Sequence, residues 1–238
     1  MEDLKPHHTI EYEGTNLAVI IKRNALARRM VLRPWQSHGE SLDGAIVTIP
    51  CGFNDRDALK FVRLKAGWII EKLSNLPKLI KLEDGVEIPY LGITHKIIHE
   101  PSAKRGVWRE YPVIHVSGKA EFLSRRLQSW FKSEAKKLIT KRAKIKSDKI
   151  QREICKITIR DPRSRWGSCS RNGKLSFSWR LIMAPEFVFD YVVAHEIAHL
   201  EEPNHGAKFW ALTNKLCQDT KEAKNWLRIN GSFLHRYY

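Results

Sequence analysis

The chain has 238 residues, 42% of them hydrophobic, which is enough for one large domain or two small ones with an apolar core. It contains no run of about 18 apolar residues, so the sequence excludes a membrane-spanning helix. Lysine and arginine number 42 against 26 acidic residues, a net charge of +16. Such a surplus favours nucleic acid, nucleotides or other polyanions as partners, but a well-solvated basic surface accounts for it equally well.

Cysteine usage and the first residues indicate the compartment. The four cysteines are scattered and include no C-x-x-C pair, which argues against a zinc ribbon or a disulfide framework. The first eight residues are polar and charged, unlike a signal peptide. We therefore expect a cytoplasmic protein.

The first half of the chain is predicted to be rich in β-structure. Strand-like runs occur at residues 17–22, 30–34, 45–50, 93–99 and 113–116. Asn54 is a suitable N-cap for a helix that runs to about residue 73. His95 and His99 share one face of a predicted strand, and with His115 they raise a second metal site as an alternative. No carboxylate motif accompanies them, which disfavours that alternative. No internal repeat is apparent.

The pattern changes around Gly118, where we place the boundary between a β-rich region, residues 1–118, and a second domain, residues 119–238. Residues 119–150 form a long helical pattern with an apolar stripe and many cations. The stripe consists of Leu123, Leu127, Trp130, Phe131, Leu138 and Ile145. The cationic side is either a solvated helix face or a surface that follows phosphates, and the sequence does not decide between them.

A β-hairpin is predicted just before a buried helix. Residues 154–160 alternate as a strand does, and Asn172-Gly173 favours a type I′ turn, which needs positive φ at both positions. Residues 185–200 are apolar almost all round, as in a helix buried on nearly every side. Two further helices are expected at residues 208–217 and 222–229. These elements predict an α+β fold with a mostly helical catalytic part and a short sheet beside its central helix.

The buried helix carries the pattern H-E-x-x-H at His195, Glu196 and His199, and His205 follows six residues later. Residues four apart on a helix lie on one face, so both imidazoles can bind one metal ion, with Glu196 placed to take a proton from a water. The alternative is a pair of core histidines that are hydrogen-bonded to backbone carbonyls. We favour the metal site because buried polar groups need partners and one ion serves all of them.

The third ligand is left open by the residues alone. His205 is favoured over Glu201 and Glu202, because both glutamates lie within one turn of His199 and would have to fold back. Glu202 stands where metzincins have glycine, so the turn is expected from residues 203–204. Arg165 and Arg180 are candidates for gripping a substrate carbonyl, carboxylate or phosphate, with surface salt bridges as the alternative.

The sequence resembles the YgjP-like metallopeptidase family, a group of small zincins. The resemblance rests on residues 163–169 (RSRWGSC), 178–182 (SWRLI), 192–200 (VVAHEIAHL) and 204–210 (NHGAKFW), and more weakly on 26–33 and 61–69. It implies a zincin-like catalytic part in which His195, His199 and His205 hold one Zn²⁺. A more distant resemblance is to SprT-like proteases, which cut proteins crosslinked to DNA and share a downstream histidine followed by an aromatic residue, here His205 and Phe209.

The expected function is therefore a zinc-dependent metallopeptidase with Glu196 as general base and a polypeptide as substrate. Two alternatives remain at this point. The same site is able to hydrolyse a nucleotide phosphoanhydride, with nearby cations on the phosphates. The second alternative is a nucleic-acid-binding module in which the zinc is structural. A structural zinc requires a closed site, with Cys169 or a glutamate as the fourth ligand.

Overall fold

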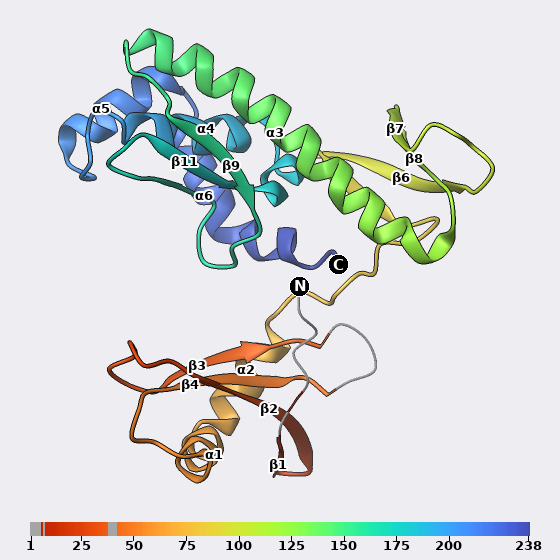
Figure 1. The fold of residues 1–238 in the computed structure, drawn as a ribbon, viewed down its shortest axis with the longest axis vertical. Helices are drawn as coiled ribbons and strands as arrows, with labels where there is room; N and C mark the ends of the chain where they lie inside the picture. Colours follow the sequence, from red (N-terminus) through yellow and green to blue (C-terminus); the bar gives the residue numbers. More distant parts are fainter. Residues whose placement is uncertain (1–5, 7, 38–41) are drawn as a thin grey trace. The chain divides into compact units, whose positions relative to one another are not determined.

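The computed structural model describes residue 6, residues 8–37 and residues 42–238 (Figure 1). Most of the first eight residues, on which the prediction about a signal peptide rests, lie outside this range. Within it, the fold is mixed α+β, with six α-helices and three small sheets, which confirms the predicted class. No helix of the described chain combines the length and the apolar composition that crossing a bilayer requires.

The chain forms two compact units, the first ending at Leu79 and the second spanning residues 80–238. The first unit contains a four-stranded sheet in the order β1-β2-β4-β3, followed by two helices. Its elements are β1 (His8–Tyr12), β2 (Thr15–Arg23), β3 (Val31–Trp35), β4 (Gly44–Ile49), α1 (Asp55–Leu64) and α2 (Ala66–Ser74). Apolar residues of the sheet, such as Val19 and Val47, share a core with Val62 of α1 and Ile69 of α2.

The helix predicted to follow Asn54 begins where expected, but it is interrupted at Lys65. Asn54 caps α1, and it exchanges hydrogen bonds of 3.0 Å with Asp57 in a capping box. At Lys65 the backbone leaves helical geometry, with φ −107° and ψ 10°, and its N–H bonds to the carbonyl of Val62. The single predicted helix is therefore two helices, α1 and α2.

The second unit begins with another four-stranded sheet, in the order β5-β6-β8-β7. Its strands are β5 (Glu87–Tyr90), β6 (Ile93–Glu100), β7 (Val107–Glu110) and β8 (Val113–Ser117). The boundary between the units, at residues 79 and 80, differs from the predicted one at 118 and 119. The reason is packing, because Ile97 and Ile114 of this sheet share one core with Leu127 and Phe131 of the long helix that follows.

That helix, α3 (Leu123–Lys149), spans the second unit and contacts both of its sheets (Figure 1). Its buried side recurs every four residues at Leu127, Phe131, Ala135, Ile139 and Ala143. Ile145, placed in the stripe by the sequence analysis, is instead 50% exposed. The helix therefore presents one continuous apolar ridge against which the rest of the unit packs.

The remaining elements surround the predicted buried helix. A three-stranded sheet has the order β10-β11-β9, with β10 antiparallel and β9 parallel to the central strand. The elements are β9 (Lys156–Arg160), β10 (Gly167–Cys169), β11 (Lys174–Ser178), α4 (Glu186–Ala198), α5 (Ala207–Leu216) and α6 (Thr220–Asn230). β10 pairs only with β11 among the described strands, so it is an edge strand, and it contacts α4.

The hairpin between β10 and β11 is present, but its turn is not type I′. Only Gly173 has positive φ, at +67°, and Asn172 does not. The N–H of Gly173 bonds to the carbonyl of Ser170, and the N–H of Ser170 bonds to the carbonyl of Lys174. This pattern is that of a three-residue loop, in which a type I turn is followed by a left-handed glycine.

Candidate metal centre

α4 places two of the predicted ligands at its C-terminal end. Its core-facing residues are apolar and wholly buried, including Val193, Ala194 and Ile197. His195 lies in the last turn, and His199 is the C-cap residue. A turn closed by the N–H of Gly206 and the carbonyl of Asn204 then leads into α5, so the expected turn lies one to two residues further on.

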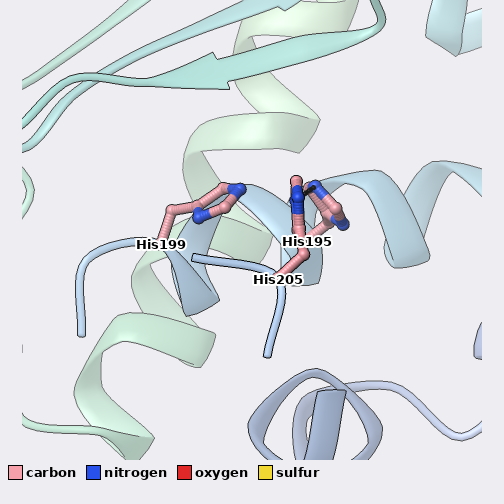
Figure 2. Close-up of side chains that lie close together, drawn as sticks. All are labelled: His195, His199 and His205. Atoms are coloured by element: carbon pink, nitrogen blue, oxygen red, sulfur yellow. Dashed lines mark hydrogen bonds between the residues drawn. The ribbon is translucent and has the colours of Figure 1, made fainter. Parts of the chain in front are cut away.

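The three histidines converge. One ring nitrogen from each of His195, His199 and His205 lies within 4.8 Å of the others, and no cysteine or carboxylate of the described chain joins this group. The Nε2 atoms of His195 and His205 are 3.1 Å apart (Figure 2). Glu201 and Glu202, the alternative third ligands, are not members. A closed site with Cys169 or a glutamate as fourth ligand is not formed by the described residues.

This donor set fits a divalent metal ion of the first transition row. Tetrahedral ligands at the usual Zn–N distance are about 3.3 Å apart, which is close to the separation of the Nε2 atoms of His195 and His205. The other nitrogen of His199, Nδ1, lies 3.1 Å from the carbonyl of Glu202, to which it donates, and Nδ1 of His195 lies 3.4 Å from the Tyr191 hydroxyl. Such contacts orient imidazoles whose remaining nitrogen binds metal.

Burial favours the neutral form of His195 and His199, which is the form that binds metal. Burial, together with the positive charges of His199, His205 and Lys224, lowers the pKa of His195 to about 4. Burial also lowers the pKa of His199, although the hydrogen bond to Glu202 opposes this shift. Both rings therefore have a free lone pair at neutral pH.

Glu196 follows His195 on α4 and lies outside the group of three histidines. Its residue is 5% exposed, and burial raises the pKa of its carboxyl to about 8, with Arg165 acting in the opposite direction. Its carboxylate is pressed against the edge strand: a Cβ built on Gly167 would lie 2.5 Å from both Cγ and Oε1 of Glu196. Only glycine at residue 167 leaves room for the Glu196 carboxylate in this position.

Cys169 and Tyr191 flank the same carboxylate. Burial and the charge of Glu196 raise the pKa of the Cys169 thiol to about 11 and that of the Tyr191 hydroxyl to about 12. Both groups therefore stay protonated near neutral pH. Tyr191 precedes His195 by four residues, so helical spacing was the signal that could have identified it in the sequence.

The two predicted arginines have different surroundings. Arg165 is exposed and lies within electrostatic range of Glu196. Arg180 is 4% exposed and forms a two-pronged pair with Asp161, at 2.7 and 3.2 Å. It also donates to the carbonyls of Leu234 and Tyr237 at 3.0 and 2.9 Å. Its donors are thus engaged inside the protein, where they anchor the C-terminal segment rather than face a substrate.

His95, His99 and His115 do not form a second metal cluster in the described chain. His95 bonds through Nδ1 to the carbonyl of Ile93 at 2.8 Å, and His99 bonds through Nε2 to the carbonyl of Gly118 at 2.6 Å. His115 pairs with Glu100 at 2.5 Å and stacks on Trp108. Each ring has its own partner.

Comparison with known proteins assigns the family. The family described as "YgjP-like, metallopeptidase domain" matches residues 38–230, most of the chain. The chain belongs to this family. The metal centre therefore lies in a YgjP-like metallopeptidase domain, and a peptidase-type hydrolase is the activity that this membership supports.

A search of curated proteins finds no significant match. Among solved structures, the zymogen of the metallopeptidase abylysin from Pyrococcus abyssi is similar, with 21% identity and a TM-score of 0.36. The aligned region covers 42% of this chain and 97% of that one.

Proposed function

We propose that this YgjP-like protein is a zinc-dependent peptidase with a zincin-like catalytic part, in which His195, His199 and His205 hold one Zn²⁺. The observation that carries the proposal is the convergence of three imidazole nitrogens within 4.8 Å, beside a buried carboxylate from the same helix. Three protein ligands leave a fourth position for water or a substrate carbonyl, as in catalytic zinc sites. When bound, the ion supplies Lewis acidity, which lowers the pKa of water and polarises a carbonyl.

Glu196 is the proposed general base. Its carboxyl gains a cationic neighbour when the site is loaded, so its pKa falls below the raised value of about 8 and the carboxylate is able to accept a proton. It then passes this proton to the leaving amine of the cleaved peptide. The absence of a side chain at Gly167 leaves the space that Glu196 occupies, and a positioned general base contributes roughly 10²- to 10⁴-fold to the rate.

Substrate binding is assigned to the edge of the small sheet. β10 has an unpaired side within the described chain and contacts α4, so an extended peptide is able to add to it by main-chain hydrogen bonds. Such pairing aligns the peptide along the metal centre. Arg165, exposed and close to Glu196, is the side chain we assign to the substrate carbonyl.

The test compares two variants with wild type for metal content, folding and peptide cleavage. Glu196→Gln keeps the shape of the side chain but removes the base, so it should retain one equivalent of zinc and lose at least about a hundredfold in rate. His195→Ala should lose the metal. An unfolded protein and nucleoside triphosphates serve as parallel substrates. Full cleavage by Glu196→Gln, or hydrolysis of the triphosphates alone, would overturn the proposal.

A further inference from the structure

A pocket of about 660 Å³ lies between α4 and α6 in the second unit. It is lined by Tyr191, Lys221, Lys224, Asn225, Leu227 and Arg228. The α6 residues are spaced by three and four, so they project from one face of that helix. The size is within the range of pockets that hold small ligands or single side chains.

The pocket is one side chain away from two of the metal-centre histidines. Tyr191, which forms one wall, has its hydroxyl 3.4 Å from Nδ1 of His195. On the opposite wall, Nζ of Lys224 lies 4.0 Å from the centre of the Trp210 ring. Trp210 in turn stacks on His205, with ring centres 5.7 Å apart. The side chains of Tyr191, Lys224 and Trp210 thus connect the pocket to two rings of the candidate metal centre.

The charge of the pocket is unbalanced. Lys221, Lys224 and Arg228 line it, no carboxylate does, and no described carboxylate lies within ion-pair distance of these three cations. Asn225 is uncharged, and its side-chain oxygen accepts a hydrogen bond from Arg228 at 2.8 Å. The pocket is therefore suited to an anionic group.

A second cationic pocket, between α3 and α4, shows the contrast. Four cations line that pocket, Lys141, Arg142, Lys146 and Lys149, together with the acids Glu186 and Asp190. Arg142 pairs with both acids, and Lys146 bonds to Asp190 at 2.8 Å. Two of its four cations, Arg142 and Lys146, are thus paired with acids that line the same pocket, whereas no carboxylate lines the pocket between α4 and α6.

We propose that the pocket formed by Lys221, Lys224 and Arg228 binds a carboxylate of the peptide substrate, so that the enzyme selects an acidic residue or a free C-terminus within one or two residues of the scissile bond. This inference rests on the proposed peptidase function and specifies its substrate class. Charge-assisted hydrogen bonds to a carboxylate are among the stronger polar contacts. We expect kcat/KM for a peptide with glutamate at this position to exceed that for glutamine by about tenfold or more, which corresponds to about 1.4 kcal/mol.

The experiment uses the full-length, zinc-loaded protein and quenched fluorescent peptides. The peptides differ only in glutamate, glutamine or lysine at each position around the mapped cleavage site, and each is made with a free and with an amidated C-terminus. The charge-reversed variant Lys221→Glu/Arg228→Glu is compared with Lys215→Glu, an exposed lysine of α5 outside the pocket. Binding of the same peptides to metal-free protein and to zinc-loaded Glu196→Gln is measured by fluorescence anisotropy.

Wild type and Lys215→Glu should prefer glutamate by about tenfold in both cleavage and binding, and the reversed variant should lose this preference or favour lysine. A preference that persists after amidation identifies an acidic side chain, and one that disappears identifies the C-terminus. Equal cleavage and binding of the three peptides by wild type would overturn the inference about the pocket. If that cleavage still depended on zinc and on Glu196, the proposed peptidase function would stand. An unchanged preference in the reversed variant would also overturn it.

Discussion

Two groups of three histidines in the second unit differ in what their rings contact. His95 and His99 of β6 and His115 of β8 each bond to a separate carbonyl or carboxylate. The rings of His195, His199 and His205 instead turn toward one another, with one nitrogen of each within 4.8 Å of the others (Figure 2). Each ring of the first group is bonded to its own partner in the protein, whereas the rings of the second group bring one nitrogen each toward the others.

The difference follows from secondary structure rather than from residue type. His95 and His99 are four residues apart, as are His195 and His199. On a strand, four residues span about 13 Å, whereas on a helix they bring Cβ atoms to about 5–6 Å. The same spacing therefore separates one pair of imidazoles and brings the other within reach of a single ion.

Removal of one histidine from each group is the strongest test of this difference. His199→Ala should lose its bound zinc after dialysis and all measurable peptide cleavage, because two imidazoles cannot hold the ion against competition from buffer. His115→Gln should retain one equivalent of zinc and wild-type cleavage. Metal analysis of both dialysed proteins checks the prediction, and a full equivalent of zinc in His199→Ala would contradict it.

Arg180 and Arg165 extend the comparison to arginines. Arg180 is saturated by Asp161 and two carbonyls, so Arg180→Ala leaves a half-buried carboxylate without its partner and should lower the free energy of unfolding by about 3–5 kcal/mol. Arg165→Ala, which removes an exposed side chain, should change stability by less than about 0.5 kcal/mol and reduce cleavage. Urea denaturation of both variants tests this. Equal loss of stability in the two would contradict it.

The sequence predicts the convergence of the three histidines better than it predicts the fold. His195 and His199 stand out because helical spacing turns a short pattern into a three-dimensional arrangement. The space for Glu196 beside Gly167 joins residues 29 positions apart, and nothing local to either residue indicates this contact. The same holds for Arg180, whose carbonyl partners lie more than 50 residues further along the chain.

Composition changes at residue 118, where the domain boundary is predicted, whereas the chain divides into two compact units between residues 79 and 80. The structure also contains a recurrence that the sequence hides. Both four-stranded sheets have the same connectivity, with two antiparallel hairpins joined through a central parallel pair. Both first hairpins turn through two residues of positive φ, Glu13-Gly14 and Leu91-Gly92.

Gly167→Ala tests whether the carboxylate beside the metal centre needs its present position. The added Cβ would lie 2.5 Å from Glu196, so the carboxylate must move, and a displacement of about 1 Å costs up to about a hundredfold in rate. Zinc content should stay at wild type, since the ligands are untouched. Gly206→Ala is the control, because a Cβ there meets nothing within 4 Å, and it should remain within about twofold of wild type. Unchanged kcat in Gly167→Ala would contradict the positioning role.

His99→Ala should give the smallest effect, and it tests the group of histidines that are bonded to their own partners in the protein. Nε2 of His99 donates to the carbonyl of Gly118 at 2.6 Å, in a half-buried contact that ties β6 to the end of β8. Loss of this hydrogen bond should lower the free energy of unfolding by about 1–2 kcal/mol, because the carbonyl is left without its partner. Zinc content and cleavage should not change, since this ring does not belong to the converging group. Urea denaturation with parallel metal analysis measures both, and a loss of zinc in folded His99→Ala would mean that the two groups of histidines are not independent.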